Sequence, residues 1–117
     1  MARVGAIYTF EAAHHLPLVP DGHKCKRVHG HNYKVEVMLS APTLDERGFV
    51  LDFADLDAAM QPLIAKLDHT LLNDTGGLEN PTAEIMVNWF RERLQAALPG
   101  FRPIVRVWET DRYFAEA

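Results

Sequence analysis

Two histidines separated by one glycine, His29 and His31, have the spacing that most clearly suggests chemistry in this sequence. Alternate residues of a β-strand share one face and lie roughly 6.6 Å apart, so both rings can reach one ion at Zn–N distances of about 2.0–2.1 Å. His14, near the end of another predicted strand, is a candidate third ligand, with His15 and His23 as rivals. Three histidines leave a fourth position open, which is typical of catalytic zinc. The alternative is a pair of surface or hydrogen-bonded histidines.

Cys25 is the only cysteine, so the chain cannot form an internal disulfide. Its neighbours His23, Lys24, Lys26 and Arg27 are basic, and nearby positive charge favours the thiolate. One interpretation is therefore a reactive thiol. A fourth metal ligand, which would make the site structural, and a small buried loop residue are the alternatives.

Carboxylates occur at two further positions of interest. Asp68 precedes His69, and a carboxylate close to an imidazole can orient it for proton transfer, although an Asp-His pair in a loop is usually just solvated. Glu109 ends a predicted strand on the face of Val105 and Val107. A partly buried carboxylate there would pair well with the N–H groups of a guanidine-like ligand; an exposed strand-end glutamate is the alternative.

The strands that must position these residues are indicated by period-two alternation. Residues 4–14 and 31–40 read as strands joined by a loop over 15–28, which holds two prolines and an Asp-Gly pair. A turn at 45–48 predicts a hairpin into residues 48–53. The last strand is predicted over 102–110.

Two helices are predicted between these strands. The first has an apolar stripe at helical spacing, Leu56, Met60, Leu63 and Leu67. Asp52 or Asp55 is its expected cap, and Pro62 predicts a kink or a later start.

For the second helix, Asn80 is the expected N-cap and Pro81 the first helical residue. Its predicted buried face consists of Met86, Phe90, Leu94 and Ala97, with Ile85 and Trp89 alongside, and Pro99-Gly100 ends it. The predicted order β, β, β, α, α, β indicates an α+β fold in which the helices cover one face of an antiparallel sheet.

Composition bounds the function classes. Residues 1–117 are expected to form a single domain, with 48% hydrophobic and 24% charged residues, as in soluble globular proteins. A net charge of −4 argues against a broad basic surface for nucleic acid. No apolar run approaches the roughly 18–20 residues of a membrane span, and no secretory signal is recognisable, so a cytoplasmic protein without membrane partners is expected.

Five ordered motifs, FEAAHHLP, CKRVHGH, LDHTLLND, ENPTAE and WET, resemble the 6-pyruvoyltetrahydropterin and 6-carboxytetrahydropterin synthase family over nearly the whole chain. The Cys-x3-His-Gly-His spacing is similar to the carboxytetrahydropterin branch, which acts in queuosine and deazapurine biosynthesis. The resemblance implies a tunnelling fold, a small antiparallel sheet with two helices. It also implies a homohexamer of two stacked trimeric barrels with sites between subunits.

The resemblance also implies roles for individual residues. His14, His29 and His31 would bind zinc, and Cys25 would be the proton-abstracting thiolate. Where the family commonly has arginine after the first zinc ligand, this chain has His15, which keeps His15 open as an alternative ligand.

Four other residues carry implied roles in the same family. Asp68 and His69 would form a proton relay that can serve a neighbouring subunit's cysteine. Glu109 would anchor the guanidine-like edge of the pterin and join the relay, and Glu84 would help to hold the pterin.

The implied substrate is 7,8-dihydroneopterin triphosphate, converted to 6-carboxy-5,6,7,8-tetrahydropterin with loss of acetaldehyde and triphosphate. Local positive charge makes Lys24, Lys26 and Arg27 candidates for the triphosphate. The alternatives are 6-pyruvoyltetrahydropterin synthase or a related pterin side-chain lyase and, in another class, a non-catalytic zinc-binding module in which Cys25 completes four ligands.

Overall fold

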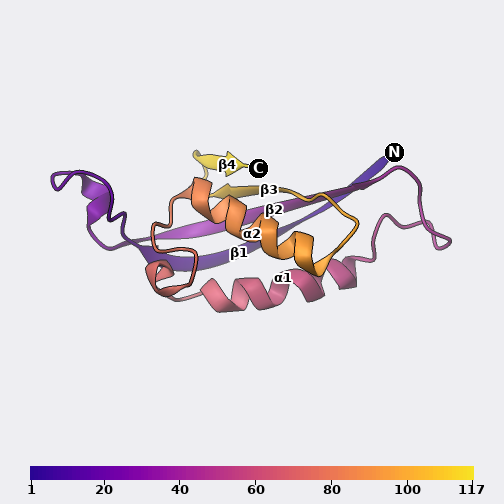
Figure 1. Cartoon of the computed structure of the whole chain (residues 1–117), viewed down its shortest axis with the longest axis horizontal. Helices are drawn as coiled ribbons and strands as arrows, with labels where there is room; N and C mark the ends of the chain where they lie inside the picture. The colour runs from indigo at the N-terminus through magenta and orange to yellow at the C-terminus, as the bar shows by residue number, and fades with distance from the viewer.

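A four-stranded antiparallel sheet forms one layer of the protein, and two helices cover one of its faces in the computed structural model, which describes residues 1–117 (Figure 1). The strands are β1 (Ala2–His14), β2 (His29–Ala41), β3 (Ile104–Trp108) and β4 (Phe114–Glu116), in that spatial order. The predicted class, an antiparallel sheet with two helices on one face, is confirmed. Neither helix is long and apolar enough to cross a membrane.

The long β1–β2 ladder is built on the alternation seen in the sequence. Phe10 and Tyr33 lie directly opposite each other, and their rings stack with centroids 5.0 Å apart in the core. Glu11 and Asn32, the next pair, point to the exposed face. The ladder ends with His14 opposite His29, so the side-chain period places both rings on the face that the helices cover.

Helix α1 (Phe53–Leu67) begins where the Asp52 side chain accepts the N–H of Ala54. The prediction that Pro62 delays its start is wrong, because the helix runs through this exposed proline. An interior proline costs about 3 kcal/mol. Burial of apolar side chains on both sides of it offsets that cost, and the buried set is Leu56, Met60, Ile64 and Leu67.

Helix α2 (Ala83–Ala97) begins two residues later than predicted. Thr82, not Asn80, is its N-cap, and the Thr82 hydroxyl accepts the N–H of Ile85 at 3.1 Å. A threonine that reaches the third helical N–H is an ordinary cap. Ile85 and Ala97 are exposed, whereas Val87, which was not predicted, is buried, so the buried face is shifted around the helix relative to the prediction.

The predicted strand over 48–53 does not form. The Asp45 carboxylate accepts the N–H groups of Arg47 and Phe49, which closes a local turn, and the chain then runs to the Asp52 cap. Both edges of β2 are already paired, with β1 and β3, so a returning strand has no place beside it. The short β4, which the sequence did not predict, pairs instead with β3.

Candidate metal centre

Four side chains at one end of the sheet bring their donor atoms together. One donor atom each from His14, His29, His31 and Glu109 lies within 4.8 Å of the others. His14 is the last residue of β1, and His29 and His31 open β2. Strand pairing and alternation therefore set the positions of the three rings.

Glu109 reaches the same cluster from the end of β3. Its Oε1 lies 3.2 Å from His14 Nε2 and 3.1 Å from His31 Nε2, and its side chain is 27% exposed. Contact with the His14 ring is the main cause that lowers the pKa of this carboxyl, and burial opposes it. The sequence predicted Glu109 as a ligand anchor; the structure places its oxygen among the histidine nitrogens.

Two backbone carbonyls fix which nitrogen of the rings carries a proton. His14 Nδ1 lies 2.9 Å from the carbonyl oxygen of Pro81, and His29 Nδ1 lies 2.7 Å from that of Arg27. A carbonyl only accepts, so each Nδ1 donates and each Nε2 presents a lone pair to the cluster. This is the way in which metal-binding histidines are usually oriented.

The third ring supplies an unsatisfied atom. His31 Nε2 is buried without a hydrogen bond, because the Glu109 oxygen 3.1 Å away lies outside hydrogen-bonding geometry. Burial is the first cause that lowers the pKa of His31, which favours the neutral ring that binds metals. Three inward nitrogens and a carboxylate oxygen fit a divalent cation, because imidazole and carboxylate are common ligands of such ions.

The two rival histidines lie outside this cluster. His15 follows the end of β1, and its backbone N–H donates to Asn73 Oδ1 at 3.0 Å. His23 Nδ1 accepts the N–H of Cys25 at 3.0 Å and caps a short 3-10 helix, η1 (Lys24–Lys26). Of the candidates for the third nitrogen, only His14 is brought to the other two.

Cys25 lies in the loop between β1 and β2, partly buried, and is not among the four clustered residues. Figure 1 shows this loop at one end of the molecule, beyond the sheet. The backbone carbonyl of Cys25 accepts the N–H of Leu16 at 2.8 Å, which ties the loop to the residues that follow β1. The structure therefore gives no support to Cys25 as a fourth ligand within this chain.

The basic residues around Cys25 differ in their surroundings. Lys26 Nζ pairs with Asp21 at 2.8 Å, so its charge is partly satisfied within the loop. Lys24 and Arg27 are exposed and form no ion pair. Two of the three candidates for an anionic group are thus available at the surface.

Asp68 and His69 meet as the sequence suggested, on the free edge of β1. His69 Nδ1 lies 2.9 Å from Asp68 Oδ1, and its Nε2 lies 3.6 Å from Glu11 Oε2. The N–H of Glu11 donates to Asp68 at 3.0 Å and is the first cause that lowers the pKa of Asp68, ahead of His69. His69 has a left-handed backbone with φ of 58°, and its N–H donates to the Glu11 carbonyl.

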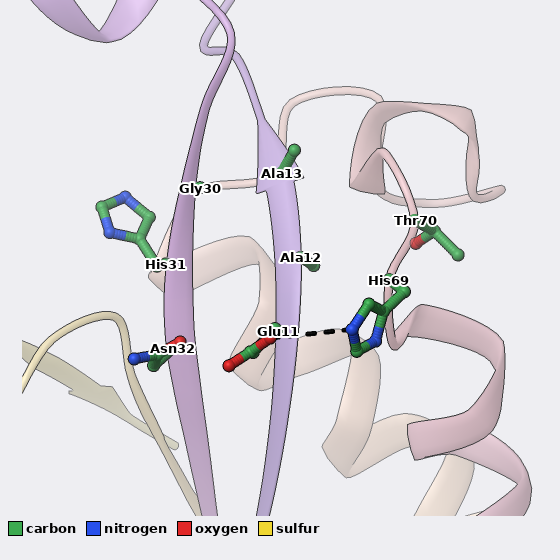
Figure 2. A pocket seen from close by; sticks show the side chains of 8 residues that line it. All are labelled: Glu11, Ala12, Ala13, Gly30, His31, Asn32, His69 and Thr70. Atoms are coloured by element: carbon green, nitrogen blue, oxygen red, sulfur yellow. Dashed lines mark ion pairs between the residues drawn. The ribbon is translucent and has the colours of Figure 1, made fainter.

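The pair does not join the metal cluster of its own chain. Figure 2 shows His31 beside β2 and His69 beside β1, on the outer sides of the two strands, with the His69 ring directed toward Glu11. The His69 side chain is 74% exposed. It lines an open hollow of about 580 Å³ that also includes Glu11, Asn32 and His31 of the cluster.

Glu84 lies in the first turn of α2 and is exposed. It is outside the four-residue cluster, although the helix start that carries it follows Pro81, whose carbonyl orients His14. Sequence reasoning missed the orienting carbonyls of Pro81 and Arg27 and the contact of Glu11 with His69. The position of a backbone carbonyl cannot be read from residue types. Glu11 lay within the motif FEAAHHLP, but its contact with His69 is visible only when the segment that carries His69 is placed beside β1.

Known proteins similar to this chain were found by sequence and by fold. A family model described as 6-pyruvoyl tetrahydropterin synthase matches residues 4–117. A Synechocystis protein named 6-carboxy-5,6,7,8-tetrahydropterin synthase is 42% identical, over 92% of this chain and 89% of the relative. A Pyrococcus furiosus protein named dihydroneopterin monophosphate aldolase is 30% identical, over 98% and 96%. The fold is similar to that of the Caenorhabditis elegans 6-pyruvoyl tetrahydropterin synthase, with a TM-score of 0.87 and 24% identity over 99% of this chain and 94% of that one.

Proposed function

This chain belongs to the 6-pyruvoyl tetrahydropterin synthase family, and on that premise we propose that it is a zinc-dependent 6-carboxy-5,6,7,8-tetrahydropterin synthase. It would convert 7,8-dihydroneopterin triphosphate and water to 6-carboxytetrahydropterin, acetaldehyde and triphosphate, as a cytoplasmic lyase of queuosine biosynthesis. The observation that carries the proposal is the convergence of three inward histidine nitrogens on one point. The name of the 42% identical relative and the Cys-x3-His-Gly-His spacing favour the carboxy product.

His14, His29 and His31 would hold the zinc ion. The Pro81 carbonyl sets the tautomer of His14, and the Arg27 carbonyl sets that of His29. When bound, zinc polarises hydroxyl and carbonyl oxygens of a substrate side chain and so acidifies neighbouring C–H bonds. The three strand-borne rings define where that side chain must lie.

Cys25 is the proposed base that removes a proton from the substrate side chain. Its loop carries unpaired positive charge on Lys24 and Arg27. The same two cations, with Lys26, are proposed to contact the triphosphate, the lysines as point charges and Arg27 through its planar guanidinium. Elimination of triphosphate would follow from proton removal at the adjacent carbon.

Asp68 and His69 are proposed to move protons to and from the substrate. Asp68 holds the His69 ring through Nδ1, which leaves Nε2 for transfer. Neither residue is among the four clustered donors of its own chain, which supports a site completed by a second copy. A homohexamer made of two trimers, the assembly implied by the family, would bring one copy's Asp68 and His69 to another copy's Cys25.

Glu109 is proposed to bind the guanidine-like edge of the pterin and to take part in the proton relay. Its lowered pKa keeps it ionised, and an ionised carboxylate is a strong acceptor for two parallel N–H donors. Glu84, at the exposed start of α2, is a further proposed pterin contact.

Product analysis tests the proposed reaction. Zinc-loaded protein is incubated with 7,8-dihydroneopterin triphosphate, and products are identified by mass spectrometry together with an assay for acetaldehyde. Equal amounts of acetaldehyde and 6-carboxytetrahydropterin are expected. A pyruvoyl product without acetaldehyde would assign the chain to the pyruvoyl branch. Turnover of dihydroneopterin monophosphate alone would favour the activity named for the Pyrococcus furiosus relative.

Replacement of the cysteine separates an enzyme from a zinc-binding module. Cys25→Ala is expected to keep one zinc per chain and to lose nearly all turnover, because Cys25 lies outside the four-residue cluster. Zinc content is measured by elemental analysis on the same preparation that is assayed. Loss of the zinc with the thiol would instead support a four-ligand structural site.

A further inference from the structure

The last rung of the β1–β2 ladder leaves the next residue without a sheet neighbour. The ladder ends with His14 opposite His29, so the backbone N–H and carbonyl of His15 need other partners. The side-chain amide of Asn73 supplies both. Asn73 Oδ1 accepts the His15 N–H at 3.0 Å, and Asn73 Nδ2 donates to the His15 carbonyl at 2.8 Å. One amide thus supplies the two backbone hydrogen bonds that a neighbouring strand would otherwise make with His15.

The same amide also holds the segment on the other side of His14. Asn73 Nδ2 donates to the carbonyl of Glu79 at 3.2 Å. Two residues later, the Pro81 carbonyl accepts the Nδ1 proton of His14 at 2.9 Å. Asn73 therefore joins the backbone that carries His14 to the segment that orients its ring.

Asn73 itself sits on a fixed support. It belongs to the 3-10 helix η2 (Leu72–Asp74), where the Leu72 side chain is fully buried. Just before it, the Thr70 carbonyl accepts the N–H of Ala13 at 2.9 Å on the free edge of β1. The amide consequently projects from a segment that is already attached to β1.

We propose that Asn73 is a positioning residue for the metal centre, which fixes His14 through the backbone on both sides of its ring; this inference rests on the proposed metal site. The residue type suits the task, because a side-chain amide combines an acceptor and two donors. Aspartate offers only acceptors and would face the His15 and Glu79 carbonyls with a negative oxygen. Outer-shell groups of this kind typically alter metal affinity by about 10- to 100-fold.

The test measures zinc affinity directly, by competition with a chromophoric chelator, on metal-free protein and without substrate. Asn73→Ala and Asn73→Asp are expected to bind zinc about 10- to 100-fold more weakly than the wild type. Tyr8→Phe is the matched control, because it removes a different bond that secures β1, the 2.6 Å contact from the Tyr8 hydroxyl to Asp57. Its zinc affinity should stay within about threefold of the wild type, although its unfolding midpoint falls.

Two results would overturn the inference. If both Asn73 variants bind zinc as tightly as the wild type, Asn73 only supports the loop. If Tyr8→Phe weakens zinc as much as they do, the effect is general destabilisation. Should Asn73→Ala not fold, Asn73→Asp, which keeps the acceptor for His15, decides alone. A wild-type protein without measurable zinc affinity would instead refute the proposed metal site, while zinc binding without turnover would refute only the proposed reaction.

Cobalt provides a second readout that a purely structural role would not change. The visible absorption of the Co²⁺-loaded protein reports the arrangement of its ligands. The Asn73 variants should show shifted or weakened bands, because His14 is no longer held in place. Tyr8→Phe should give the wild-type spectrum.

Discussion

The Nε2 atoms of His14 and His29 face each other at 3.0 Å, and each ring donates its Nδ1 proton to a backbone carbonyl. Two imidazole lone pairs at this separation repel unless a positive charge lies near both. The register of β1 against β2 brings the two rings together, because His14 and His29 form the last pair of the β1–β2 ladder. The strand pairing that builds the fold therefore also brings together donors that could hold a cation.

Removal of one of these rings should abolish tight metal binding. His29→Ala is expected to weaken zinc binding by more than the about 10- to 100-fold typical of outer-shell changes, because a direct ligand is lost. His15→Ala is the matched control, since His15 lies outside the cluster. Chelator competition measures both. Equal losses in the two variants would contradict the assignment of ligands.

The Glu109 carboxylate is expected to matter more for turnover than for metal retention. Glu109→Gln keeps the side-chain shape but removes the charge that pairs with a guanidine-like group. We expect kcat/KM to fall by at least about 100-fold, equivalent to about 2.7 kcal/mol. Zinc affinity should change by less than about tenfold, as three nitrogens remain. A loss of zinc as large as that of His29→Ala would make Glu109 a metal ligand instead.

The basic loop should act on the triphosphate alone. Replacement of Lys24, Lys26 and Arg27 by Gln is expected to raise KM for the triphosphate substrate and to spare zinc. Because Lys26 already pairs with Asp21, the double variant of Lys24 and Arg27 should account for most of the rise.

The charge-matched control for this loop replaces three unpaired, exposed cations elsewhere, Lys66, Arg91 and Arg102, by Gln. Steady-state kinetics at several salt concentrations provide the measurement. An unchanged KM in the loop variant, or an equal rise in the control, would remove the loop from the substrate site.

A site shared between copies can be tested by mixing inactive proteins. His29→Ala lacks a proposed metal ligand of β2. His69→Ala lacks the proposed proton carrier, which lies beside β1. After the two proteins are unfolded and refolded together, some sites combine an intact metal cluster with an intact His69. Activity should return in the mixture and stay absent when each is refolded alone. No recovery in a verified mixed oligomer would place both groups in one chain's site.

Acid should weaken the attachment of the Asp68 loop. The N–H of Glu11 and then His69 hold the pKa of Asp68 below its ordinary value of 3.8. The unfolded carboxylate protonates first, so this group stabilises the folded state above about pH 4 and ceases to do so as pH falls through the lowered pKa.

The measurement compares the urea midpoint of the metal-free protein at pH 5 and pH 3. Asp68→Asn should lose less stability over this range than the wild type. Asp74→Asn, which replaces an exposed carboxylate without a hydrogen bond, should follow the wild type. If Asp68→Asn loses as much stability between pH 5 and pH 3 as the wild type, the hydrogen bond from Glu11 to Asp68 contributes nothing to acid stability.

Strand alternation allowed much of the site to be foreseen. It placed His29 and His31 on one face and Glu109 on the face of Val107, because a two-residue period depends only on local backbone geometry. Apolar residues at helical spacing also identified both helices. The family was recognised from the same short motifs, and the match over residues 4–117 confirms it.

Features that depend on distant segments were not foreseen. Thr82 replaced Asn80 as the cap of α2, and the strand after Gly48 was absent because β2 had no free edge. The choice of His14 over His15 required the register of β1 against β2. Such information lies in pairing between segments, which periodicity along one segment does not contain.

Since two of the donors are partners in a regular sheet, we expect the polypeptide to reach its final shape before any ion arrives. Small zinc domains, whose ligands gather only around the metal, unfold when it is withdrawn. Folding and metal loading would here be separate events. We therefore expect that the metal can be removed and restored without unfolding, so that the ion available at that step would decide which element the proposed site carries.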